Sequence, residues 1–163
     1  MRNRGIPHDA PVWNDAGNGG GSWTIHTNTE LFGSVRVDVP AKTADPTLTD
    51  VQNRSLQMLR SLPKSLRPAL LGALQSYAMR YLGDDYVPED CDFLCDNASV
   101  PYLHESSSTY VFLNASSDVD EEHGVCFLIR NSGVIACCHG DESLQFYDWD
   151  ATDELDSLGD NGG

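Results

Sequence analysis

The sequence predicts a single α+β domain, with a mostly antiparallel sheet and two helices packed on one face. Two alternating apolar runs near the start, a long helical periodicity in the middle and several short strand-like runs afterwards support this prediction. Strands and helices that are grouped along a chain, rather than alternating, are typical of α+β proteins. A chain of 163 residues has room for one domain.

Composition changes near both ends set the predicted domain boundaries. Residues 1–22 end in the glycine-rich sequence Gly-Asn-Gly-Gly-Gly-Ser, so we expect a disordered lead-in there. The single domain is predicted over residues 23–150. Residues 151–163 are acidic and end in Asp-Asn-Gly-Gly, so we expect a flexible acidic tail, in which Leu155 and Leu158 allow one short helical turn.

The first two strands are predicted from patterns of period two. Residues 23–27 place Trp23 on the same face as the next apolar side chain, and residues 35–39 alternate valine with polar side chains. Phe32-Gly33 lies between the two runs, so we expect an antiparallel pair. Pro40 should end the second strand, because proline has no N–H to donate to the ladder.

The first helix is predicted by its cap. Thr49 followed three residues later by Gln52 matches a capping box, in which each residue satisfies a backbone N–H of the other. Apolar side chains then recur at helical spacing. We therefore predict a helix over about residues 50–61, ended by Pro63.

The second helix has the strongest periodic pattern of the chain. It should begin near Ser65, which places Pro68 in the first turn, where a missing N–H costs nothing, and it should be capped by Gly83. Its apolar stripe is predicted to pack in the core. The stripe consists of Leu66, Ala69, Leu70, Ala73, Leu74, Tyr77, Ala78 and Tyr81.

The remaining elements are predicted as strands. Residues 100–104 are predicted to pair with 110–113, after a short element around Phe93-Leu94. Residues 125–130 and 134–138 flank Asn131-Ser132-Gly133, a sequence that favours a hairpin turn because Asn and Gly tolerate positive φ. A last short strand is predicted over 146–149.

The charge is unevenly distributed along the chain. The net charge is −15, but residues 1–80 carry nine Lys and Arg against six Asp and Glu, a net of +3. Residues 81–163 carry nineteen acidic residues and one basic residue, Arg130, a net of −18. Such a field repels the phosphates of nucleic acids and attracts a basic partner. Solubility alone is the alternative explanation.

The cysteines and the N-terminus favour the cytoplasm. The five cysteines are odd in number and two are adjacent, which favours free, mostly buried thiols over disulfides. No apolar segment follows the N-terminal arginines, so we expect no secretory signal. No apolar stretch approaches the length of about 20 residues that a membrane span needs, so we expect no membrane contact.

The segment Asp120-Glu121-Glu122-His123-Gly124 is the most conspicuous polar cluster, and three interpretations of it compete. In the first it is structural: acidic side chains accept backbone N–H groups, Gly124 has an unusual φ or packs closely, and a neighbour holds His123. In the second it is part of a surface that binds a basic partner.

In the third interpretation the segment binds a metal ion. His123, Glu122 and Glu121 would be joined there by His139 and Asp141 from a later loop, since imidazole and carboxylate groups bind divalent metals. The spacing is not that of a calcium-binding loop, because His123 stands where that loop needs glycine.

Catalytic signatures are weak. A nucleophile pair of Cys138 with His123 or His139 is a further alternative, although no activated-nucleophile pattern accompanies it. Phosphate-loop, dinucleotide-binding, zinc-protease and serine-hydrolase motifs are missing from the sequence. We therefore predict no catalytic residues and no cofactor, and we favour a binding protein over an enzyme.

The same segment carries a resemblance to a group of small uncharacterised bacterial α+β domains. These domains have a Trp-Asp-Glu-Glu-His-Gly sequence, or a close variant, before an apolar strand and a turn with Asn or Gly. Residues 120–124 match this pattern, with Val119 in place of the tryptophan, and Asn131 and Gly133 follow in the turn. The resemblance covers about residues 23–142 and implies a bacterial cytoplasmic domain with no established activity.

The sequence thus predicts a cytoplasmic interaction module that binds a basic protein partner through its acidic second half. Some small acidic domains of this kind act as immunity proteins against toxins, which is an analogy of size and charge. The alternative is a metal-binding or metal-dependent enzyme domain that uses the Glu-Glu-His-Gly segment.

Overall fold

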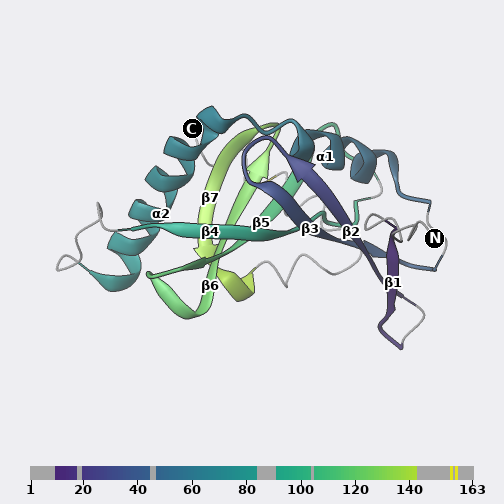
Figure 1. Cartoon of the computed structure of the whole chain (residues 1–163), viewed down its shortest axis with the longest axis horizontal. Coiled ribbons are helices and arrows are strands. Elements are labelled where there is room, and N and C mark those ends of the chain that lie inside the picture. Colours follow the sequence, from purple (N-terminus) through teal and green to yellow (C-terminus); the bar gives the residue numbers. More distant parts are fainter. Residues whose placement is uncertain are drawn as a thin grey trace, which may run out of the picture.

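The computed structural model describes residues 10–17, 20–44, 47–83, 91–103 and 105–142, together with Leu155 and Ser157. Within these residues, seven strands form one sheet, and two α-helices follow the third strand (Figure 1). The α+β class and the mostly antiparallel sheet are therefore confirmed. None of the helices in the described part of the chain has the length and apolar character that a membrane span requires.

The strands lie side by side in the order in which they occur in the sequence. Their bounds are β1 Val12–Asp15, β2 Gly21–Thr29, β3 Gly33–Ala41, β4 Phe93–Ser99, β5 Tyr110–Ser117, β6 Asp120–Arg130 and β7 Gly133–His139. Strands β3 and β4 are parallel, with Val37 opposite Ala98, and the other neighbours in this sheet are antiparallel. A parallel pair needs a crossover connection, and the helical segment between β3 and β4 supplies it.

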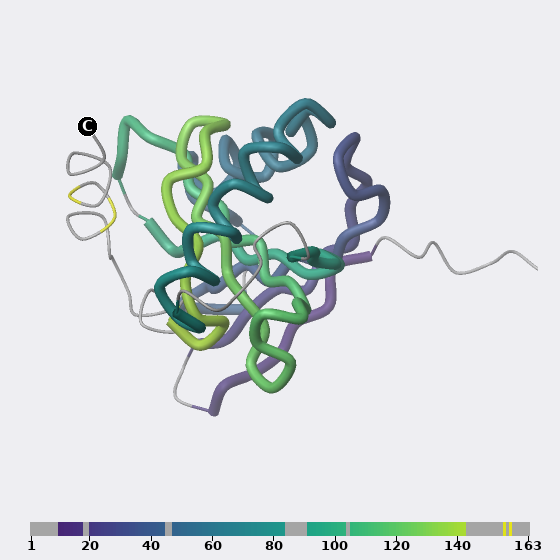
Figure 2. Tube along the Cα trace, turned by 90° about the vertical axis from the view of Figure 1, so that its left-hand side faces the viewer, coloured from purple at the N-terminus to yellow at the C-terminus, as the bar shows by residue number. Residues whose placement is uncertain are grey.

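Strand β1 lies in the segment that was predicted to be a disordered lead-in, and β2 begins at Gly21 rather than Trp23. That prediction was wrong for these residues. Trp13 pairs with Trp23 across the two strands, with ring centroids 5.3 Å apart, and Asn14 donates a 2.9 Å hydrogen bond to Thr24. Figure 2 shows the β1–β2 hairpin projecting from the sheet. The glycine content suggested disorder because it does not reveal this contact between side chains on two different strands.

Helix α1 (Asp50–Arg60) has the predicted cap. The Gln52 N–H donates to Thr49 Oγ1 at 3.1 Å, and the Thr49 N–H donates to Gln52 Oε1 at 3.1 Å. The Thr49 hydroxyl also donates to the Leu103 carbonyl at 2.9 Å, which ties the helix to the segment after β4. Both predictions, the capping box and the helix bounds, are confirmed.

Helix α2 (Arg67–Leu82) follows a short 3₁₀ helix, Lys64–Leu66, so that Pro68 lies in its first turn and Gly83 caps its end with φ +84°. Leu70, Leu74, Tyr77 and Ala78 of the predicted stripe are buried. Tyr81 is 54% exposed and stacks on Tyr77 instead of entering the core.

Two hydrophobic cores lie on opposite faces of the sheet, because side chains alternate along each strand. Val111 and Leu113 of β5 belong to the first core, which also contains buried residues of α1, α2 and five strands. The second core contains Val51, Leu103, Tyr110, Phe112, Cys126, Leu128 and Leu155. Leu155 is completely buried there, so the prediction of a flexible tail is wrong at this residue.

Two predictions about the strands are wrong, and a third cannot be compared with the described residues. Pro40 lies inside β3, beyond Asp38, the last residue of this strand that pairs with β4. The partner of β5 is β4 rather than residues 100–104, of which 100–103 are described and form no strand. The predicted strand over 146–149 lies outside the described residues.

The β6–β7 hairpin is confirmed, with a two-residue turn. Arg130 pairs with Gly133, and the turn residues Asn131 and Ser132 have φ +48° and +69°. Positive φ at both positions is characteristic of a type I′ turn, whose twist suits a hairpin. Ser132, rather than the predicted Gly133, adopts the second positive φ.

Candidate functional site

The segment Asp120–Gly124 forms the start of β6 and contains a bulge. Ser117 pairs with Asp120 and Ala115 with Val125, so residues 121–124 of β6 stand opposite a single residue of β5. We call residues 121–124 the bulge. Bulges redirect side chains away from the regular alternation of a strand, and this one separates the buried Asp120 from the exposed Glu121 and Glu122.

Two glycines allow the bulge to pack against its neighbours. Gly124 has φ +68°, and a Cβ atom there would lie 2.5 Å from the Ala115 carbonyl oxygen. A Cβ atom at Gly140, just after β7, would collide with the carbonyl oxygen of His123. The main chain therefore approaches itself on both sides of the bulge, which confirms the predicted special role of Gly124.

Asp120 lies at the centre of the polar contacts. Its side chain is 5% exposed, and its Oδ1 accepts a 3.0 Å hydrogen bond from the backbone N–H of His123. Nδ1 of His123 lies 3.5 Å from Oδ1, and Nε2 of His139 lies 3.3 Å from Oδ2. The two imidazole rings are 4.6 Å apart between centroids. One buried carboxylate thus faces two histidines that come from different strands.

These contacts shift two pKa values. The hydrogen bond from the His123 N–H, helped by the two imidazoles, holds the pKa of Asp120 below its ordinary value, although burial opposes this shift. Burial, followed by the charge of Asp120, raises the pKa of Tyr77 to about 12. Asp120 is therefore ionised and Tyr77 protonated at neutral pH.

The hydrogen bond from Asp141 selects the tautomer of a neutral His139. The backbone N–H of Asp141 donates to Nδ1 of His139 at 3.2 Å. A neutral imidazole that accepts at Nδ1 carries its proton on Nε2. Nε2 is the ring nitrogen nearer to Oδ2 of Asp120, so the negative charge of Asp120 favours this tautomer.

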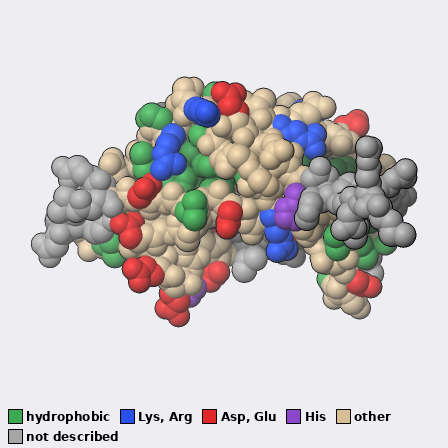
Figure 3. Space-filling view, in the orientation of Figure 1, with side chains coloured by type: hydrophobic (Ala, Val, Ile, Leu, Met, Phe, Trp, Pro, Cys, Tyr) green, Lys and Arg blue, Asp and Glu red, His purple; other side chains and the backbone are tan. Residues whose placement is uncertain are grey.

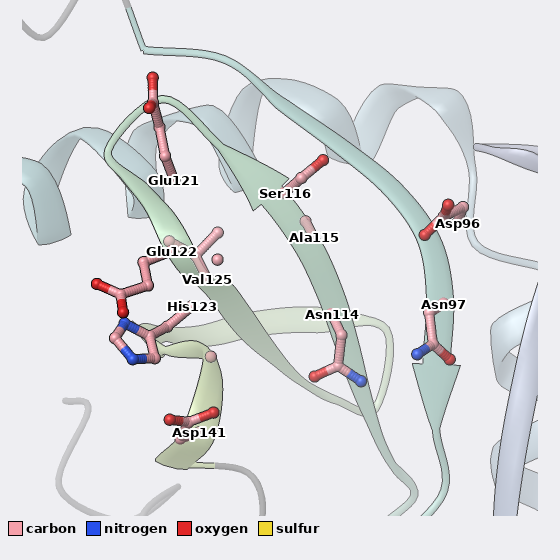
Figure 4. A pocket seen from close by; sticks show the side chains of 12 residues that line it. Asp96, Asn97, Asn114, Ala115, Ser116, Glu121, Glu122, His123, Val125 and Asp141 are labelled. Atoms are coloured by element: carbon pink, nitrogen blue, oxygen red, sulfur yellow. The ribbon is translucent and has the colours of Figure 1, made fainter.

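A polar cavity of about 460 Å³ lies beside the bulge. We call it the acidic pocket. It is lined by Asp96, Asn97, Asn114, Ala115, Ser116, Glu121, Glu122, His123, Gly124, Val125, Gly140 and Asp141. Figure 4 shows Glu122, His123 and Asp141 toward one end, and Asp96 and Asn97 on β4 toward the other. Strands β4, β5 and β6 and the end of β7 therefore build the pocket together.

The register of β4 and β5 brings the side-chain amides of Asn97 and Asn114 together in the acidic pocket. Asn97 of β4 pairs with Asn114 of β5, which in turn pairs with Cys126 of β6, a residue of the second core. Asn97 Oδ1 is buried and accepts no hydrogen bond from any described residue. A buried acceptor without a donor is unusual in a folded protein.

The structure separates the residues of the predicted metal site. His123, His139 and Asp120 come together, whereas Glu121 and Glu122 lie on the exposed side of the bulge. Asp141 lies further away, with Oδ2 4.0 Å from Nδ1 of His139. The sequence prediction missed Asp96, Asn97 and Asn114, because their place in the pocket depends on the pairing of β4, which no local pattern reveals.

The cysteines have structural surroundings. All five are free thiols, and four of them are buried. Cys138 Sγ donates to the Cys126 carbonyl at 3.5 Å and packs against the second core, so its contacts do not support the alternative of a nucleophile pair with a histidine. Burial raises the pKa of Cys137 to about 12, which keeps this thiol protonated and weakly nucleophilic at neutral pH.

Two chemical abilities follow from this geometry. The acidic pocket suits cationic or hydrogen-bond-donating groups, and the Asp120 carboxylate with its two histidines suits a proton or a metal ion. Comparison of the chain with protein-family models, with curated proteins and with solved structures found no match.

Proposed function

We propose that this domain is a cytoplasmic interaction module that binds a basic protein partner, with an arginine or lysine side chain of the partner in the acidic pocket. The observation that carries the proposal is the lining of the pocket. Four carboxylates line it, from Asp96, Glu121, Glu122 and Asp141, and no lysine or arginine does.

The surrounding charge supports a cationic ligand. Arg130, the basic residue of the acidic second half, lies near the other end of β6, where its guanidinium is 5.9 Å from the Tyr110 ring centroid and Nε donates to Ser108. In the view of Figure 3, several acidic side chains gather along the lower left of the molecule, and lysine or arginine side chains lie above them at the upper left. An uncompensated negative field raises the association rate of a basic partner and repels nucleic acid.

The amides of the pocket favour a ligand with several N–H donors. Asn97 and Asn114 line the same cavity as the carboxylates, and an amide oxygen accepts N–H groups. An arginine guanidinium carries five N–H groups in a planar fork, so it can donate to a carboxylate and to an amide oxygen at once. The volume of about 460 Å³ is within the range of about 300–1,000 Å³ that is usual for ligand sites.

We include in this proposal that the chain is a bacterial domain of the kind that carries a Glu-Glu-His-Gly segment. Val119, which replaces their tryptophan, is 4% exposed and packs in the first core, so an apolar side chain at this position has a structural role. A bacterial toxin with a basic surface is a partner of the proposed class. The free cysteines agree with a reducing compartment.

We also infer that the two helices cover one face of the sheet and leave the acidic pocket on the other. Most buried apolar side chains of both helices belong to the first core, and Val51, at the start of α1, packs in the second. Asn114, in contrast, alternates with Leu113 along β5 and therefore points toward the face of the second core. A partner could then reach the pocket without displacing a helix.

The test uses a short arginine-rich peptide with a fluorescent label and measures anisotropy over ~20 to ~300 mM NaCl. The double variant Glu121→Gln/Glu122→Gln should weaken binding at least about twofold, because each exposed ion pair contributes about 0.2–1 kcal/mol. Asp96→Asn should weaken it from the opposite end of the pocket.

The matched control is Glu30→Gln/Glu105→Gln, which changes the net charge equally at two exposed positions outside the pocket. This control should bind the peptide nearly as the unchanged protein does. Equal weakening by both double variants would show that general charge, and not the pocket, attracts the peptide. Absence of binding at low salt would also refute the proposal.

A further inference from the structure

We propose that Asp120, His123 and His139 form a binding site for one divalent transition-metal ion of the zinc type. One potential ligand atom from each residue lies within 4.8 Å of the other two. These ligands come from β6, the bulge and the end of β7, which the two close approaches at Gly124 and Gly140 hold together. The site is distinct from the carboxylates of the proposed peptide pocket and does not depend on a partner.

The chemistry of the three side chains selects the class of metal. Two imidazole nitrogens and one carboxylate oxygen are a frequent ligand set for zinc and for other first-row divalent ions. Calcium and magnesium prefer a shell of oxygen atoms, which two imidazoles do not provide. Three protein ligands leave a fourth tetrahedral position for water or an added ligand.

The second oxygen of Asp120 gives independent support. Oδ1 accepts the His123 N–H, but Oδ2 is buried and accepts no hydrogen bond from the described residues. Although Nε2 of His139 is 3.3 Å away, the contact lacks the alignment of a hydrogen bond. A buried, ionised oxygen without a donor is costly, and a cation beside it would remove that cost.

Binding requires a rearrangement at His139, and Asp141 is placed to assist it. In the structure, Nδ1 of His139 accepts the Asp141 N–H, so Nε2 holds the proton. A metal on Nε2 would replace that proton, and Nδ1 would then carry a proton and need an acceptor. Oδ2 of Asp141 lies 4.0 Å from Nδ1, close enough to accept after a small side-chain movement. Asp141 would act as a positioning residue, as carboxylates commonly do behind metal-bound histidines.

The test measures metal binding directly on the full chain, freed of metal by chelation and dialysis. Zn²⁺ binding is followed by titration calorimetry, and Co²⁺ serves as a spectroscopic probe because its visible absorption reports nitrogen ligands and tetrahedral geometry. We expect one ion per chain. His123→Gln and His139→Gln should each weaken binding at least about tenfold, and Asp141→Asn should weaken it less.

His123→Gln is the decisive variant, because its side chain is 40% exposed and its loss should leave the fold intact, as circular dichroism can verify. The matched control is His26→Gln, which removes an exposed histidine of β2 and should bind Zn²⁺ unchanged. The proposal is refuted if the unchanged protein binds no Zn²⁺ at millimolar concentration. It is also refuted if folded His123→Gln and His139→Gln both bind Zn²⁺ as tightly as the unchanged protein.

These outcomes are independent of the peptide experiment. Glu121→Gln/Glu122→Gln retains all three proposed ligands, so this variant should bind Zn²⁺ nearly normally even if it loses the peptide. Conversely, His123→Gln retains all four carboxylates of the acidic pocket. Failure of one proposal can therefore be told apart from failure of the other.

Discussion

The buried carboxylate of Asp120 lies 3.3 Å from Nε2 of His139, which belongs to the neighbouring strand and not to the acidic segment itself. The carboxylate also accepts the backbone N–H of His123 at the bulge. Asp120 therefore connects the bulge of β6 with the end of β7, because its carboxylate contacts a polar group of each.

Replacement of Asp120 should lower stability to an extent that depends on the new side chain. Asp120→Ala leaves the His123 N–H without its acceptor, so the melting temperature at pH 7 should fall. Asp120→Asn keeps an oxygen that can accept this N–H and should melt between Asp120→Ala and the unchanged protein. Thermal unfolding followed by circular dichroism measures the order. An Asp120→Ala variant that melts no lower than Asp120→Asn would contradict the assigned hydrogen bond.

The close approaches around the bulge give a second prediction. Gly124→Ala should lose about 1–2 kcal/mol or more, because φ +68° is unfavourable for alanine and the Ala115 carbonyl occupies the space of its Cβ. Gly140→Ala should also be destabilised, through contact with the His123 carbonyl. Gly133→Ala is the control, since its nearest contact would be 3.5 Å from the Arg130 carbonyl. Urea unfolding compares the three, and an unstable Gly133→Ala with stable Gly124→Ala would contradict this account.

Local signals account for the elements that the sequence predicted correctly. Each of these signals involves only a few neighbouring residues. They are the capping box of Thr49 and Gln52, Pro68 in the first turn of α2, Gly83 at the end of α2, and the turn at Asn131. Their physical causes, cap hydrogen bonds and allowed φ values, are encoded in adjacent side chains. Such features do not depend on the rest of the fold.

Features that arise from distant pairing could not be predicted in this way. The parallel register of β3 and β4 forms across two helices. The contact between Trp13 and Trp23 forms only after β1 and β2 have paired. The candidate site shows the same division. Its acidic segment was conspicuous in the sequence, but Asp96 and Asn97 reach the acidic pocket only through the register of β4.

The cap of α1 provides a third prediction. Thr49→Ala removes the acceptor of the Gln52 N–H and the hydroxyl that donates to Leu103, and should cost about 1–2 kcal/mol of unfolding free energy. Thr49→Ser keeps the hydroxyl and should restore most of the loss. Chemical unfolding of both variants checks this. If Thr49→Ser were as unstable as Thr49→Ala, the missing methyl group rather than the hydrogen bonds would be responsible.

Alkaline pH should destabilise the fold through its buried thiols and phenol. Burial raises the pKa of Cys95 from 9.0 to about 12, and the pKa values of Cys137 and Tyr77 also rise to about 12. In this range the unfolded chain releases protons that the folded chain retains, so the free energy of unfolding falls as pH rises. Below about pH 9 these groups are protonated in both states and the contribution is constant.

The Cys95→Ala variant isolates one of these groups. It should be less stable at pH 7 because a buried side chain is shortened, but its stability should fall less steeply between pH 9 and 12. The difference in slope should approach about 1.4 kcal/mol per pH unit, which corresponds to one proton. Urea unfolding at a series of pH values measures both slopes. Parallel curves for the variant and the unchanged protein would mean that Cys95 ionises in the folded state near its ordinary pKa. That result would conflict with its burial in the first core, where it is 5% exposed.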